Sequence, residues 1–189
     1  MYDLLQRIIF RNELRKAQIS LLHEIEPTDK IAIIGGGTGW ILTQIPHKNL
    51  EIDYIERSEQ MIKLSKIRST NHHVNFINTS HLQEDKKYDV VITPFVLDCI
   101  PHDLLNDFVQ EIAKKVNSKW ICTDFNVDDN RLRSKILTKA MIFFFKITTQ
   151  IPVNKLVSYF NVIENNGFAP KTKVMFVNGF VKSQLFVKE

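Results

Sequence analysis

The sequence has few cysteines and no group of residues with metal-ligand spacing. Cys99 and Cys122 are the only cysteines among 189 residues. Two thiols do not make a disulfide framework, and neither belongs to the paired spacing of a zinc site. Both stand in apolar, strand-like surroundings, so we expect them to be small buried residues, and we expect no metal centre.

Long hydrophobic runs are also missing. The longest one, Ala140 to Phe145, is too short to cross a bilayer. The first residues, Met1-Tyr2-Asp3, lack the charged region and apolar stretch of a signal peptide. The chain contains no repeat, linker or low-complexity segment. We therefore expect one domain over residues 1–189, no transmembrane segment and a cytoplasmic location.

The chain has only a small excess of positive charge. The formal net charge is +4, the hydrophobic content is 44% and charged residues make up 24%, which is ordinary for a globular protein. A basic excess can attract nucleic acid or anionic lipid. No basic block accompanies an aromatic platform for bases, so we favour solvated basic faces.

Glycines are concentrated at one place, where an apolar run of strand character ends. Ile31–Ile34 leads directly into Gly35–Gly39, and a helix-compatible segment, Trp40 to Ile45, follows. Glycines allow a tight turn and the close approach of a ligand, and the first N–H groups of a helix attract anionic or polar groups. This pattern predicts a nucleotide-like cofactor on the first β-α turn of an open α/β sheet.

The glycine spacing separates two kinds of cofactor. A dinucleotide site requires G-x-G-x-x-G, but its third glycine is replaced here by Trp40, which disfavours a dehydrogenase. The spacing is instead G-x-G-x-G, at Gly35, Gly37 and Gly39. A plain glycine-rich turn without a ligand stays open as an alternative.

Strand and helix patterns alternate along the chain, which predicts an α/β fold with helices on both faces of a mostly parallel sheet. An amphipathic helix is expected first, over residues 2–25. Strands are expected at 30–35, 50–56, 74–78, 88–93, 120–124, 171–177 and 180–187. Further helices are expected from the N-cap Ser58 to Arg68 and at 103–116, 131–148 and 153–165. Asn178-Gly179 predicts a hairpin turn between the last two strands.

This order resembles the S-adenosylmethionine-dependent methyltransferases with a Rossmann-like, seven-stranded fold. The resemblance covers nearly the whole chain. It is carried by Ile34-Gly35-Gly36-Gly37-Thr38-Gly39, by Ile55-Glu56-Arg57-Ser58-Glu59-Gln60-Met61, by Tyr88-Asp89-Val90-Val91, by Phe95-Val96-Leu97-Asp98-Cys99-Ile100-Pro101 and by Asn165-Asn166-Gly167-Phe168. It implies S-adenosyl-L-methionine as the cofactor and a C-terminal antiparallel hairpin.

The resemblance also implies which residues bind the cofactor. The glycine loop would wrap under its amino-acid part, Glu56 would accept hydrogen bonds from the ribose hydroxyls, and Met61 would flank the adenine. The full expected set is Gly35, Gly36, Gly37, Thr38, Gly39, Glu56, Arg57, Met61, Ser80, His81, Thr93, Pro94 and Phe95. Two positions depart from the family, because Ile33 and Ser80 stand where its members often carry acidic residues.

Methyl transfer depends mainly on placing the acceptor against the methyl group, so a general base need not be conspicuous. Candidate catalytic residues near the strand ends are Asp98, His102, Asp124 and Asn126. For His102 the alternative is a surface residue at a helix start, and for Asp124 and Asn126 it is turn and cap chemistry.

The expected partner is a small, largely apolar acceptor. This expectation rests on the Phe-rich segment from Lys139 to Ile147, which is either a lid over such an acceptor or a helix buried on the sheet. A nucleic-acid methyltransferase is the first alternative. It is disfavoured because Thr93-Pro94-Phe95 lacks the N/D-P-P-Y/F box of amino-methylating enzymes. A protein that binds the cofactor without transferring the methyl group is the second.

Overall fold

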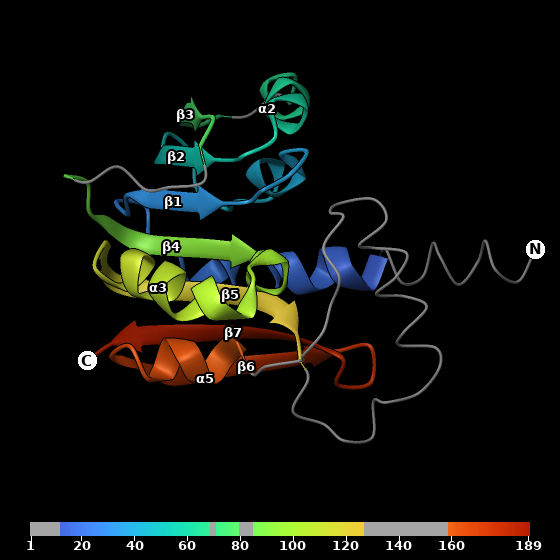
Figure 1. Ribbon diagram of the computed structural model, residues 1–189. Coiled ribbons are helices and arrows are strands. Elements are labelled where there is room, and N and C mark those ends of the chain that lie inside the picture. The colour runs from blue at the N-terminus through green and yellow to red at the C-terminus, as the bar shows by residue number, and fades with distance from the viewer. Residues whose placement is uncertain (1–11, 69–70, 80–84, 127–158) are drawn as a thin grey trace, which may run out of the picture.

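Seven strands form one sheet in the computed structural model, which describes residues 12–68, 71–79, 85–126 and 159–189 (Figure 1). The strand order is β3-β2-β1-β4-β5-β7-β6. The strands are β1 Ile31–Ile34, β2 Glu51–Ile55, β3 His73–Ile77, β4 Tyr88–Pro94, β5 Val116–Phe125, β6 Phe168–Phe176 and β7 Val181–Lys188. Strands β1 to β5 pair in parallel, whereas β7 lies antiparallel between β5 and β6. The predicted fold class is confirmed.

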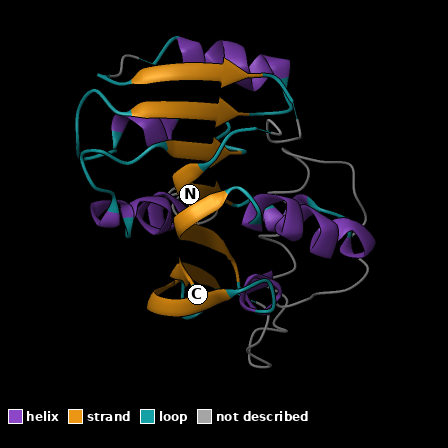
Figure 2. Ribbon diagram, turned by 90° about the vertical axis from the view of Figure 1, so that its left-hand side faces the viewer, coloured by secondary structure: helices purple, strands orange, loops and turns teal. Residues whose placement is uncertain are grey.

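Helices lie on both faces of this sheet (Figures 1 and 2). The α-helices are α2 Glu59–Lys66, α3 His102–Ala113 and α5 Tyr159–Glu164, and residues 12–19 are also helical. Three short 3₁₀ helices complete the set, η1 Leu22–Glu24, η2 Trp40–Thr43 and η3 Leu97–Cys99. In Figure 1, α3 and α5 lie in front of the sheet and residues 12–19 lie behind it. Within the described ranges, no helix has both the length and the apolar character needed to span a membrane.

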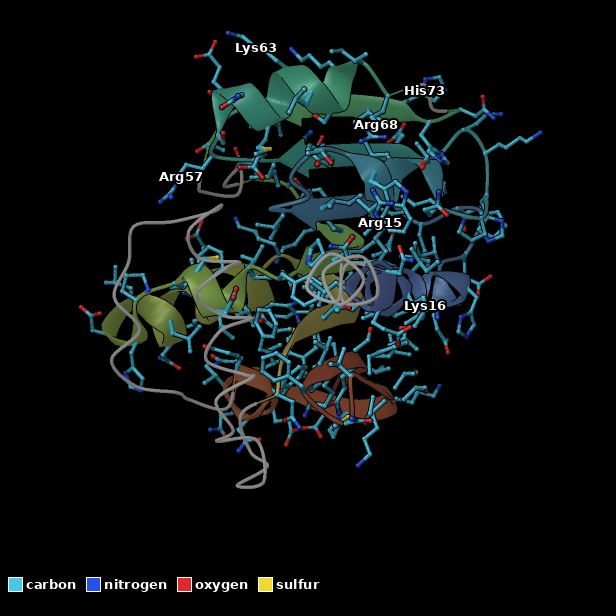
Figure 3. All side chains as sticks on the ribbon, turned by 90° about the vertical axis from the view of Figure 1, so that its right-hand side faces the viewer. Arg15, Lys16, Arg57, Lys63, Arg68 and His73 are labelled. Atoms are coloured by element: carbon cyan, nitrogen blue, oxygen red, sulfur yellow. The ribbon has the colours of Figure 1, made fainter. Side chains whose placement is uncertain are left out.

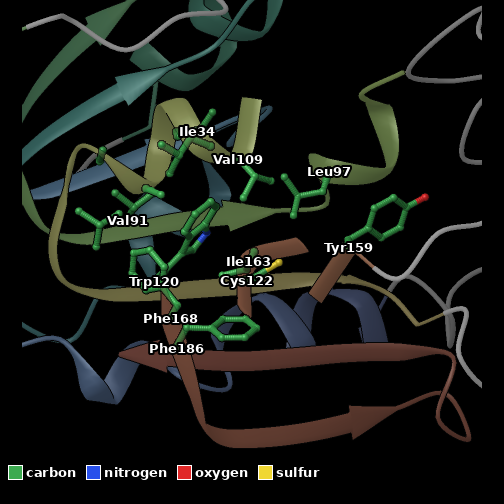
Figure 4. Close-up of a cluster of buried hydrophobic side chains, with 14 of the residues drawn as sticks. Ile34, Val91, Leu97, Val109, Trp120, Cys122, Tyr159, Ile163, Phe168 and Phe186 are labelled. Carbon is green, nitrogen blue, oxygen red and sulfur yellow. The ribbon is translucent and has the colours of Figure 1, made fainter. Parts of the chain in front are cut away.

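One apolar cluster fills the space between the sheet and the two helices in front of it (Figure 4). Trp120 of β5 lies at its centre, fully buried, with its ring edge-on to Phe168 at 5.6 Å. Its indole N–H donates to the hydroxyl of Thr93 at 2.9 Å, so the one polar atom of the ring is satisfied. Val109 of α3 and Ile163 of α5 belong to the same cluster. This packing fixes the ends of β4 and β5 relative to one another.

The N-terminal segment covers the opposite face. We expected one helix over 2–25; the described part is helical only over 12–19 and continues through a turn into η1. Leu21, Leu22 and Ile25 are nevertheless buried against β1 and β2. Residues 2–11 lie outside the described residues, as do the helix expected at 131–148 and the first part of the one at 153–165.

Several boundaries differ from the expectation. The helix predicted at 103–116 ends at Ala113, the strand predicted at 120–124 begins at Val116, and the strand predicted at 171–177 begins at Phe168. The helix predicted to reach Arg68 ends at Lys66. Asn117 and Lys119 look unlike strand residues, but Val116 and Lys119 pair with Tyr88 and Val90 of β4. Ladder pairing with a neighbouring strand thus outweighs local polarity.

The segment after the glycine loop also differs, because Trp40–Thr43 is a single 3₁₀ turn and not the start of an α-helix. Pro46 follows shortly afterwards, and the residue before a proline is restricted to extended conformations. The short turn still packs on the sheet, since Ile41 and Leu42 are buried.

Candidate active site

The carboxyl ends of β1, β2, β4 and β5 meet at one edge of the sheet, on the right in Figure 1 and facing the viewer in Figure 3. Four segments follow these strand ends: Gly35–Gly39, residues 56–58, residues 95–99 and residues 124–126. The strand order changes direction between β1 and β4, since β2 and β3 lie on one side of β1 and β4 and β5 on the other. In open α/β sheets, ligands usually bind at the carboxyl ends of the strands at this point.

The glycines of the loop have two different functions. A Cβ atom on Gly36 would lie 2.5 Å from Tyr54, and one on Gly39 would lie 2.6 Å from Ser65. One on Gly35 would overlap the side chain of Val96. These three glycines are therefore needed for packing. Gly37 differs, because no atom of the described part of the chain lies within 4 Å of the space its Cβ would take.

Glu56 holds the glycine loop from the end of β2. Its Oε2 accepts the N–H of Gly37 at 3.1 Å, and its Oε1 accepts the N–H of Ser58 at 2.8 Å. The hydroxyl of Tyr54 donates to the carbonyl of Gly37 at 2.9 Å. A carboxylate has about four lone-pair sites, so Glu56 retains acceptor capacity for two ribose hydroxyls. Glu56, which the sequence assigns to the ribose, thus lies against the glycine loop in the structure.

The neighbours of Glu56 form the rim of the same edge. Ser58 caps α2, since its hydroxyl accepts the N–H of Met61 at 3.4 Å, as the sequence predicts. Met61 is half-buried and Arg57 is exposed. The side chain of Arg68 donates through Nε to the carbonyl of exposed Thr38 at 3.0 Å. Figure 3 shows Arg57 and Arg68 from this side. Ser80 and His81 lie outside the described residues.

The residues after β4 are placed differently from the expectation that they face the cofactor. Thr93 is fully buried and accepts the hydrogen bond of Trp120, so its hydroxyl belongs to the core. Pro94 is also buried. Phe95 is 6% exposed and packs against Phe125 at 5.3 Å between ring centroids. Its φ of +57° is unusual for an aromatic residue and turns the chain sharply toward η3.

Two carboxyl groups come together where β4 and β5 end. Asp124 is fully buried, and its Oδ2 accepts the N–H groups of Leu97 at 2.9 Å and Asp98 at 3.3 Å. Its Oδ1 accepts the N–H of Phe125 at 2.8 Å. Asp124 therefore ties η3 to β5 by accepting N–H groups at the start of that helix, in line with the turn and cap chemistry considered for it as the alternative to a catalytic role.

Asp98 is the less satisfied member of this pair. Its Oδ1 accepts the thiol of Cys99 at 3.3 Å, whereas its buried Oδ2 has no partner among the described residues. Burial raises the pKa of Asp98 to about 6. Burial also raises the pKa of Asp124 well above its usual range, and the charge of Asp98 adds to this. A carboxyl group tuned toward neutral pH at a ligand edge is a candidate for substrate contact.

The remaining candidates are outside this pair. His102 is the first residue of α3 and is exposed. Asn126 is buried, and its amide donates to the carbonyl of Gly179 at 3.0 Å, so its role is to join β5 to the terminal hairpin. Across the described stretches of chain, no three His, Cys, Asp or Glu side chains form a potential metal site.

Sequence reasoning missed Tyr54, which contacts the glycine loop twice. The signal was available, because Tyr54 and Glu56 are two positions apart and side chains at that spacing leave a strand on the same face. The contact was not predicted because a tyrosine at this position can equally be an apolar core residue of a buried strand.

The family profile described as "Methyltransferase domain" matches residues 33–119, which include the glycine loop, Glu56 and the Asp98 turn. No curated protein sequence matches the chain at a significant level.

Three solved structures illustrate the similarity of fold. Magnesium protoporphyrin IX methyltransferase from Synechocystis PCC 6803 with bound S-adenosylhomocysteine has 17% identity, a TM-score of 0.67, and coverage of 97% of this chain and 85% of its own. A putative S-adenosylmethionine-dependent methyltransferase from Listeria monocytogenes has 14% identity, a TM-score of 0.61, and coverage of 93% and 99%. The N-methyltransferase NodS from Bradyrhizobium japonicum WM9 has 10% identity, a TM-score of 0.61, and coverage of 94% and 84%. At such identities the likeness is one of fold.

The family match covers three of the four segments at the ligand edge, and only residues 124–126 lie beyond it. Residues 33–119 thus match the methyltransferase domain, and the whole chain has the Rossmann-like fold of S-adenosylmethionine-dependent methyltransferases.

Proposed function

We propose that the protein transfers a methyl group from S-adenosylmethionine to a small, largely apolar acceptor, and that the cofactor lies over Gly35–Gly39 with its ribose at Glu56. The observation that carries this proposal is the free space in front of Gly37, flanked by a carboxylate that already orients the loop. A backbone without a Cβ at this point lets a flat, polar ligand approach closely.

The proposed chemistry requires little from the protein beyond placement. When bound, the cofactor supplies an electrophilic methyl group on a sulfonium. The loop and Glu56 would fix that group over the end of β1, and the acceptor would enter from the side of β4 and β5, where Asp98 and Asp124 lie. Holding the nucleophile in line with the methyl group then provides most of the rate.

The size of the acceptor is proposed from the fold relatives and the sequence. One neighbour is named as a magnesium protoporphyrin IX methyltransferase and another as an N-methyltransferase, which supports a small-molecule acceptor. Its apolar character rests on the Phe-rich segment 139–147, which lies outside the described residues.

Isothermal titration calorimetry tests the cofactor proposal. We expect S-adenosylmethionine and S-adenosylhomocysteine to bind and NADH not to bind, because Trp40 occupies the place of the third dinucleotide glycine. Tighter binding of NADH than of S-adenosylhomocysteine would overturn the assignment.

Replacing Glu56 by alanine should weaken S-adenosylhomocysteine binding by about 1.5–3 kcal/mol, the range for hydrogen bonds to a charged group. Glu56→Gln should lose less, since one acceptor oxygen remains, although the amide nitrogen accepts no hydrogen bond, so one of the N–H groups of Gly37 and Ser58 loses its acceptor. Glu59→Ala is the matched control, because Glu59 is an exposed carboxylate on the adjacent helix, paired with Lys63 at 2.7 Å. Wild-type affinity in both Glu56 variants would place the ribose elsewhere.

Replacing Phe144 by aspartate distinguishes a lid from a core helix. If the segment covers the acceptor, cofactor binding and the melting temperature should be retained while transfer to apolar acceptors falls. A buried charge in a core helix would instead destabilise the whole fold. A large drop in melting temperature would therefore contradict the lid.

A further inference from the structure

The backbone of Gly37 is held at both of its polar atoms by side chains from β2 and its end. Its N–H donates to Oε2 of Glu56 at 3.1 Å, and its carbonyl accepts the hydroxyl of Tyr54 at 2.9 Å. Tyr54 belongs to β2, and Glu56 is the residue directly after that strand, so the two side chains, two positions apart, leave the extended chain on the same side. The glycine that opens to ligand space thus has both its N–H and its carbonyl fixed by side chains.

Tyr54 is itself held firmly. Its side chain is fully buried and packs against Phe76 with ring centroids 5.4 Å apart. Its ring fills the space beside Gly36, where a Cβ would lie 2.5 Å from the hydroxyl and 2.6 Å from Cζ. Burial, together with the nearby charge of Glu56, raises the pKa of Tyr54, so its hydroxyl keeps the proton that it donates. A rigid donor at this place restricts where the Gly37 peptide can lie.

We propose that Tyr54 is a positioning residue for the cofactor: with Glu56 it fixes the backbone of Gly37, at the part of the site assigned to the amino-acid end of the cofactor. This inference rests on the proposed function. Glu56 is the shared element, because the carboxylate assigned to the ribose also orients the loop assigned to the amino-acid part. A loop fixed before binding does not lose conformational freedom when the ligand arrives.

Positioning of the loop at the amino-acid end predicts a loss of affinity that depends on the ligand. S-adenosylhomocysteine contains the amino-acid part that the loop would contact, whereas 5′-methylthioadenosine lacks it and keeps the ribose and adenine. Removing the Tyr54 hydroxyl should therefore weaken the first ligand and leave the second nearly unchanged. A defect in general stability would weaken both alike.

The experiment compares Tyr54→Phe with Tyr88→Phe. Tyr88 is also a buried tyrosine of the sheet, and its hydroxyl donates to Oδ2 of Asp53 at 2.7 Å, at the amino end of the strands. Both variants keep the ring and lose one buried hydrogen bond, so both should fold and both should lower the melting temperature. By calorimetry, S-adenosylhomocysteine binding should fall about 3- to 10-fold in Tyr54→Phe only, the equivalent of one ordinary hydrogen bond. Binding of 5′-methylthioadenosine should change less than about twofold in either variant.

Hydrogen exchange of the Gly37 amide gives a second readout that needs no ligand. It should be faster in Tyr54→Phe than in the wild type and unchanged in Tyr88→Phe. Equal losses for the two ligands, or wild-type affinity for S-adenosylhomocysteine in Tyr54→Phe, would overturn the inference and leave the proposed function standing. A wild-type protein that binds neither ligand would overturn the proposed function itself.

Discussion

Replacing Gly37 by valine is expected to abolish binding of S-adenosylhomocysteine while the protein stays folded. The backbone of Gly37 has a φ of +61°, and its missing Cβ faces open space. A Cβ there meets no atom of the described residues, so the valine side chain would extend into the volume proposed for the cofactor. The left-handed conformation costs a residue with a Cβ about 1–2 kcal/mol, which is a limited loss of stability. Binding, measured by calorimetry, should fall roughly 100-fold or more, about 2.8 kcal/mol.

Gly167 provides the matched control for this variant. Its φ is +87° and nothing lies within 4 Å of its Cβ position, but it stands after α5, at the start of β6. Gly167→Val therefore imposes comparable backbone strain far from the ligand edge. We expect both variants to lower the melting temperature and only Gly37→Val to lose binding. Full binding by Gly37→Val would show that the glycine loop is merely structural.

Replacing Asp98 by asparagine should make the protein more stable at neutral pH. The pKa of Asp98 is raised by burial from 3.8 to about 6, so the folded state holds this proton more tightly than the unfolded state. Stability must then fall as the pH rises from about 4 to about 6. Removing the ionisable group removes that fall, and the gain above pH 7 is on the order of 1–3 kcal/mol.

The pH dependence of the melting temperature is the measurement. The curves of Asp98→Asn and wild type should converge near pH 4 and separate above the Asp98 pKa of about 6, with the variant higher. Asp107→Asn, which removes an exposed carboxylate of α3, is the control and should follow the wild type. An Asp98 variant that melts at or below the wild-type temperature at pH 8 contradicts the argument. A stabilised variant would indicate that the carboxyl group is retained for function at the expense of stability.

The features predicted from the sequence are those set by local chemistry. Ser58 caps α2 through the N–H of Met61 because a hydroxyl before an apolar helical face does so in most contexts. Gly35, Gly37 and Gly39 all have positive φ, as a strand that ends in a tight turn requires. The placement of Glu56 beside the loop followed from its position at the end of the neighbouring parallel strand.

The features that were not predicted depend on partners distant in the chain. Thr93 looked like a site residue, but its hydroxyl serves Trp120 across β5. Asp124 was a catalytic candidate with turn and cap chemistry as the alternative, and the sequence did not show that the N–H groups it accepts are those of Leu97 and Asp98. In both cases a polar side chain is satisfied inside the protein, and nothing in the local sequence identifies the partner. Polar residues at strand ends are thus the least certain part of a prediction from sequence.

The antiparallel position of β7 has a consequence for how the chain folds during synthesis. Strand β6 comes before β7 in the chain, yet among the described residues β6 pairs only with β7, and β7 also pairs with the outer edge of β5. Before Val181–Lys188 are synthesised, neither of these pairings can form. A nascent chain that ends before β7 can therefore pair at most the five parallel strands, and we expect the open edge of β5 to be its aggregation-prone border.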